Sequence, residues 1–149
     1  MTTPPVKKAL EHFKGSYNCS QSVLKAILEH KGIQIGSATD FASGFGAGIT
    51  YSGQQCGAIS GAIMAIGILE GLTNSDVRKH KSITYKRSSE LHRRFKEEFG
   101  SIICDELTGI DMSDSQKLKE MNDVGHFDEV CPKFLESSVR IVMDMFTDQ

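Results

Sequence analysis

Residues 48–67 have the sequence GITYSGQQCGAISGAIMAIG, which joins small and apolar residues without a single charge. The apolar run from Cys56 to Leu69 is shorter than the roughly 20 residues that a helix needs to cross a bilayer. We therefore expect a central, buried helix over Gly53–Leu69, with Ser52 as its N-cap. Glycine costs about 1 kcal/mol relative to alanine inside a helix, so the glycines of this one need a structural reason.

Small residues recur at every fourth position of this helix, at Gly53, Gly57, Gly61 and Ala65. Residues four apart lie on one helix face, so these form a stripe that a second helix can approach closely. Two interpretations stay open. The stripe serves helix packing alone, or the close approach also brings other cysteines to Cys56 and lets a small reactant reach its sulfur.

Nearly every other segment also has the apolar periodicity of a helix, and none shows the alternation of a strand. In one expected helix, which Asn18 can cap, Val23, Ala26, Ile27 and His30 follow the spacing of an inner face. We predict an all-α fold, a compact multi-helix bundle around the small-residue-rich helix, with a single helical domain over residues 1–149. The remaining helices are expected near residues 5–14, 19–31, 40–43, 74–99, 102–107, 113–122 and 127–147.

Charge is unevenly distributed along the chain. The stretch from Arg78 to Lys96 holds eight Lys or Arg and one acid, Glu90, although the whole chain has a net charge of −2. That overall balance argues against a nucleic-acid-binding protein, so we interpret the stretch as a solvated helix face or a docking surface for an acidic partner. The N-terminus has no apolar run of signal-peptide length and we expect no membrane insertion, which makes the cytoplasm the expected location.

The four cysteines are Cys19, Cys56, Cys104 and Cys131. Structural disulfides are rare in cytosolic proteins, so their positions are more informative than their number. Three of them, all but Cys104, are predicted at helix N-termini. There the backbone N–H groups and the helix dipole favour a thiolate, which is the reactive and metal-binding form of cysteine.

Several segments together resemble a prokaryotic family that is named for its cysteine signature, C_GCAxxG_C_C, and regarded as redox-active. The matching segments are NCSQSVL at 18–24, FGAGI at 45–49, CGAISG at 56–61 and FGSIICDELTG at 99–109, followed by Cys131 before an apolar C-terminal helix. Where the signature has Gly-Cys-Ala, this chain has Cys-Gly-Ala. The resemblance implies that the four cysteines are the functional positions and that the fold is a compact helical bundle.

The residues leave the chemistry of the cysteines open. A dithiol–disulfide centre needs only two cysteines with Cα atoms within about 7 Å. We expect such thiol redox chemistry, similar to that of a thiol–disulfide oxidoreductase, with an unidentified redox partner or small-molecule reactant. Cys56 is favoured as the attacking thiol because its neighbours are the smallest, and Cys19, Cys104 or Cys131 would then resolve the mixed disulfide.

Two alternatives to thiol redox chemistry remain. One is a metal or iron–sulfur site made by the same four cysteines. The chain lacks C-x-x-C and the usual zinc and iron–sulfur spacings, but helices of a bundle can each supply one ligand. The other is a non-enzymatic scaffold in which the cysteines only fill the core. The sequence assigns no cofactor.

Overall fold

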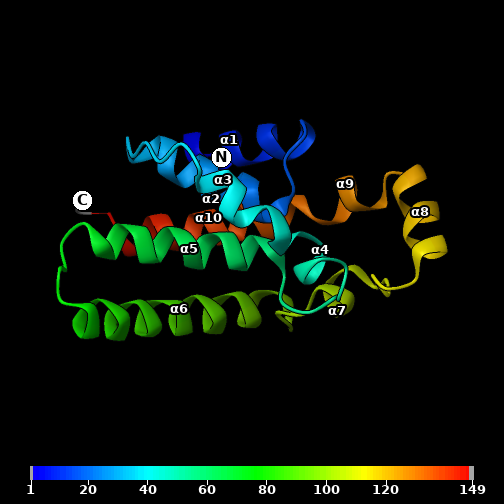
Figure 1. Cartoon of the computed structure of the whole chain (residues 1–149). Coiled ribbons are helices and arrows are strands. Elements are labelled where there is room, and N and C mark those ends of the chain that lie inside the picture. Colours follow the sequence, from blue (N-terminus) through cyan, green and yellow to red (C-terminus); the bar gives the residue numbers. More distant parts are fainter. Residues whose placement is uncertain (1, 148–149) are drawn as a thin grey trace.

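Helices form most of the chain in a computed structural model that describes residues 2–147 (Figure 1). Within that range the only paired extended residues are Gln55 and Ile103, so the predicted all-α bundle is confirmed. In chain order the elements are α1 (Pro4–Lys14), α2 (Cys19–His30), α3 (Ala38–Ala42), the 3-10 turn η1 (Ser43–Phe45), α4 (Gly46–Ile49), α5 (Gly57–Gly71), α6 (Val77–Phe99), α7 (Cys104–Thr108), α8 (Ser115–Asp123), α9 (His126–Val130) and α10 (Pro132–Met145).

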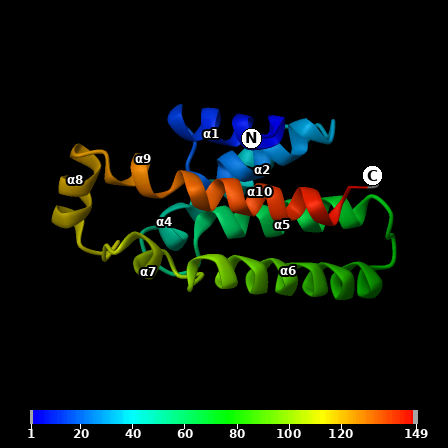
Figure 2. The ribbon, with the colours of Figure 1, turned by 180° about the vertical axis from the view of Figure 1, so that it is seen from behind.

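The central helix is α5, which packs against α2, α6 and α10 (Figures 1 and 2). Its residues Ala58, Ile59, Ala62 and Ile66 are fully buried. Burial of a large aliphatic side chain contributes about 1.5–3 kcal/mol, so this helix anchors the hydrophobic core. The expectation of a buried central helix is confirmed.

The small-residue stripe permits a close approach between α5 and α2. A Cβ atom added at Gly61 would lie 3.0 Å from the carbonyl carbon of Ser20 and closer still to its oxygen. One added at Gly57 would overlap the Sγ atom of Cys19. The stripe therefore brings the N-terminus of α2, with its cysteine, directly against the start of α5.

The helix begins later than the sequence predicts, at Gly57 instead of Gly53. The preceding residues are extended, because the N–H of Cys56 donates to the carbonyl of Ile102 (2.8 Å) and the N–H of Cys104 donates to that of Gln54 (2.6 Å). Ser52 is consequently not the cap, and Cys56 occupies that position. A pairing with residues almost 50 positions away leaves no trace in the local periodicity.

The predicted last helix over 127–147 is two helices in the structure. α9 ends at Val130, Cys131 lies between the two, and α10 begins at Pro132. Proline has no N–H to donate and fits the first turn of a helix, which is why a new helix starts there. Cys131 thus lies at the junction of two helices, as the N-cap of α10, and not inside one continuous helix.

The basic stretch lies on α6, which Asp76 caps and which begins at Val77, slightly later than the expected residue 74. Only Ser88, Leu91 and Phe95 of this helix are buried, and most of its basic side chains are exposed to solvent. The basic side chains therefore lie largely on a solvent-exposed face of α6, in agreement with the interpretation of the stretch as a solvated helix face.

The segment from α7 to α9 extends the bundle at one end (Figure 1). A second, smaller hydrophobic cluster forms there from Cys104, Ile110 and Met112, with Leu118 and Phe127 packed against it. Among residues 2–147 no helix combines the length and the apolar composition that crossing a membrane requires.

Candidate functional site

The four cysteines line one cavity of about 260 Å³, where the second hydrophobic cluster meets the main bundle. They come from four separate regions of the chain, since Cys19 begins α2, Cys56 precedes α5, Cys104 begins α7 and Cys131 separates α9 from α10. All four are free thiols. The structure thus brings together every cysteine that the sequence analysis singled out.

The extended pairing before α5 fixes the backbone at both Cys56 and Cys104. Gln55 and Ile103 form an antiparallel bridge, so the residues that follow them, Cys56 and Cys104, lie on opposite sides of it along the two segments. Two hydrogen bonds, from the N–H of Cys56 and from the N–H of Cys104, continue the pairing on either side. Backbone hydrogen bonds therefore fix the positions of both cysteines at the edge of the cavity.

Cys19 has the environment that best suits a thiolate. The backbone N–H groups of Ala47, Ser20, Gly57 and Cys19 itself act on its sulfur, and each lowers the pKa of the thiol. Ser20 and Gly57 belong to the first turns of α2 and α5, so two helix N-termini converge on one sulfur. Such N–H groups stabilise an anion and lower a thiol pKa. The burial of Cys19 acts in the opposite direction and by more, so its pKa is raised overall.

Burial dominates the other three thiols as well. It raises the pKa of Cys56 well above the ordinary thiol value, and a charge on Cys19 raises it further. Burial is also the largest cause that raises the pKa of Cys104 and of Cys131, and a charge on Cys19 is the second. Each pKa is raised to about 12. The lowered pKa expected at helix N-termini is therefore outweighed, and a first charge on Cys19 opposes a second one nearby.

A left-handed turn brings the backbone N–H of Ala47 to the sulfur of Cys19. Ala47, Ile49, Thr50 and Tyr51 all have positive φ angles, between 52° and 70°. The left-handed conformation costs roughly 1–2 kcal/mol for each non-glycine residue. The turn is closed by a bond from the N–H of Thr50 to the carbonyl of Gly46 (3.0 Å). Backbone strain of this kind clusters at functional sites, and here it borders the cavity.

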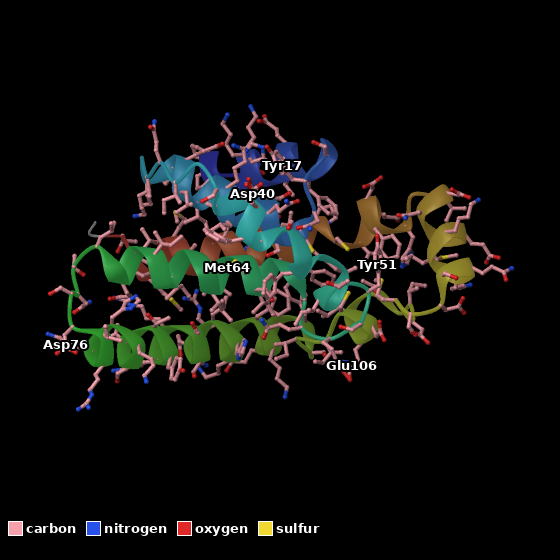
Figure 3. The ribbon with its side chains drawn as sticks, viewed as in Figure 1. Tyr17, Asp40, Tyr51, Met64, Asp76 and Glu106 are labelled. Carbon is pink, nitrogen blue, oxygen red and sulfur yellow. The ribbon has the colours of Figure 1, made fainter. Side chains whose placement is uncertain are left out.

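Sequence reasoning missed several residues that line the cavity. Tyr51 is the last residue of the left-handed turn, is labelled in Figure 3 and is 55% exposed. Asn18, the confirmed N-cap of α2, and Asp128 of α9 also line the cavity. The one available signal for the turn was the glycine-rich FGAGI segment, whereas Asp128 reaches the site only through long-range packing.

Metal ligation was the alternative function of the four cysteines. Across residues 2–147 no group of three or more His, Cys, Asp or Glu side chains is arranged to hold a metal ion. The four thiols border the cavity from different elements instead of converging on one point with metal-ligand geometry.

The fold and the site together define a helical bundle with a four-thiol cavity. The sequence matches the family model described as "Putative redox-active protein (C_GCAxxG_C_C)" over residues 17–145, and the chain belongs to this family. A relative from Archaeoglobus fulgidus, named "Uncharacterized protein", is 24% identical over 151 residues that cover 96% of this chain and 93% of the relative. No solved structure matches the chain.

Proposed function

We propose that this protein performs thiol–disulfide redox chemistry with the four cysteines of its cavity. The observation that carries the proposal is that all four thiols, from distant parts of the chain, line one cavity. Membership of a family described as redox-active supports it. The protein would act like a thiol–disulfide oxidoreductase in the cytoplasm, a reducing compartment in which free thiols persist.

We assign the attacking thiolate to Cys19. Four backbone N–H groups lower the pKa of its thiol, whereas two, those of Ala58 and Ile59, lower the pKa of Cys56. Cys56 is also only 7% exposed, which limits its access to a reactant. Cys56, which the sequence favoured as the attacking thiol, would then serve as a resolving cysteine, in company with Cys104 or Cys131.

The proposal is tested by native mass spectrometry of protein purified without oxygen, before and after a mild oxidant. Loss of two hydrogens, regained with a dithiol, is expected. A bound mass that leaves on acidification would favour the metal or iron–sulfur alternative, and an unchanged mass in both tests would favour the scaffold.

The roles of Cys19 and Cys56 are separated by two serine variants. Cys19→Ser should abolish the fast reaction with a disulfide reagent. Cys56→Ser should keep the fast first step and accumulate more mixed disulfide. The reverse pattern would return the attacking role to Cys56. Circular dichroism checks that both variants keep their helical content.

A further inference from the structure

We propose that the reactant of this thiol centre is a small, uncharged disulfide that enters the cavity, and not a disulfide on another protein. This inference rests on the proposed function and specifies its substrate class. It is carried by the burial of the sulfurs, the size of the cavity and the chemistry of its walls.

The sulfurs are difficult for a protein disulfide to reach. Cys56 and Cys104 are only 7% and 8% exposed, and Cys19 and Cys131 are partly buried and line the same cavity. Exchange needs the thiolate to contact a disulfide sulfur directly. A disulfide attached to two folded chain segments could not enter about 260 Å³, which lies below the roughly 300–1,000 Å³ of sites for drug-sized ligands.

The walls of the cavity are mostly apolar. Met112, Leu118 and Phe127 line it from the second hydrophobic cluster, and Phe13 and Phe134 line it from the main bundle. An apolar enclosure favours uncharged ligands because a charge would lose its hydration there without a partner. Neutral polar groups are available near the rim, where Tyr51 and Asn122 are exposed.

The charge of the lining also disfavours anions. Apart from the thiols, Asp128 is the one acidic residue among the described lining residues, and no Lys, Arg or His belongs to that set. Lys133 acts electrostatically on Cys131 but does not line the cavity. A carboxylate-bearing disulfide would therefore meet the charge of Asp128 with no cation in the lining to offset it.

The exchange balances with two of the four thiols. The Cys19 thiolate attacks one sulfur of the small disulfide, whose S–S bond breaks to release the first small thiolate. A second cysteine loses its proton to that thiolate and attacks the Cys19 sulfur, so the mixed disulfide breaks. The second small thiolate leaves and takes up from solvent the proton that Cys19 gave up when it became a thiolate. Two protein thiols are oxidised to one disulfide, and the small disulfide is reduced to two thiols.

The test measures the rate of thiol loss from the reduced full-length protein with three oxidants. These are the uncharged dipyridyl disulfide, the dianionic bis(nitrobenzoate) disulfide and a small folded protein with an exposed disulfide. Each rate is divided by the rate of the same oxidant with free N-acetylcysteine. We expect the normalised rate of the uncharged reagent to exceed the other two at least tenfold.

Two variants isolate the effect of charge. Asp128→Asn should raise the ratio of the dianionic to the uncharged rate about threefold to tenfold, because only the dianionic reagent is repelled by this charge. Glu129→Gln removes the same charge from the next residue of α9, which does not line the cavity, and should change neither rate by more than twofold.

The outcomes distinguish the two proposals. If two thiols are lost reversibly but the normalised rates of the three oxidants are equal, the inference is overturned and the proposed function stands. The same holds if the protein disulfide reacts fastest. Equal effects of the two variants would also overturn it. Failure of all three oxidants to remove thiols would overturn the proposed function itself.

Discussion

Replacing glycines of α5 by alanine should have opposite effects on stability at two positions. At Gly67 an added Cβ would meet only the Cγ2 atom of Thr84 at 3.9 Å, an ordinary contact. The gain in helix propensity should then stabilise Gly67→Ala by up to about 1 kcal/mol. At Gly61 the same gain is opposed by overlap with the backbone of Ser20, and overpacking costs about 1–3 kcal/mol. Because the obstacle is backbone, the cost should lie near the upper end of that range, and we expect Gly61→Ala to be destabilised by up to about 2 kcal/mol overall.

The assay is equilibrium urea unfolding of the reduced protein, followed by circular dichroism. The midpoint should rise for Gly67→Ala and fall for Gly61→Ala, with the urea dependence of the unfolding free energy unchanged. The two variants differ only in what the new methyl group touches, so each is the control of the other. Stabilisation of both by the same amount would refute the close approach of α2 to α5.

Three further predictions concern charged and titrating groups. Arg87→Met should lower the free energy of unfolding by about 1–3 kcal/mol. The substitution removes the cationic partner of Glu70, whose side chain is only 4% exposed, and so leaves a buried carboxylate without its ion pair. Arg93→Met, which removes an exposed ion-paired arginine of the same helix, should cost under about 1 kcal/mol in the same urea titration. Burial lowers the pKa of His92 below its usual 6.5, so protonation favours the unfolded chain. Stability should therefore fall as the pH drops below about 6.5, and thermal melts of His92→Gln should lose that component. Because the pKa of Cys104 is raised to about 12, its alkylation by iodoacetamide at pH 8, followed by peptide mass spectrometry, should be over tenfold slower than that of free cysteine.

Local signals in the sequence account for the helices and their caps. Asn18 was predicted to cap α2, and its side chain accepts a hydrogen bond from the N–H of Gln21 (2.9 Å) while Gln21 bonds back to it. A helix end depends on residues three or four positions apart, so it is visible in the sequence. The same holds for the small-residue face of α5, which the four-residue spacing revealed.

Contacts between distant segments explain where the predictions were wrong. The start of α5 is set by the pairing of residues 53–56 with residues 102–105, which no local pattern contains. The left-handed turn at 46–51 is adopted although Ala47 and Ile49 disfavour it, so the surrounding structure must impose it. The prediction that helix N-termini lower the thiol pKa was wrong for the same reason. Burial is a tertiary property, and its effect on the pKa outweighs that of the helix N-terminus.

By itself the sequence determined that this chain is an all-α protein of this cysteine family and that four cysteines are its candidate functional residues. Periodicity, caps and motif spacing are properties of neighbouring residues, and a sequence displays them directly. Only the tertiary structure decided that the four thiols share one apolar cavity, that Cys19 is the sulfur surrounded by N–H groups, and that Asp128 borders it. These relations join residues up to about a hundred positions apart, and they exist only once α2, α5, α7 and α9 are packed together.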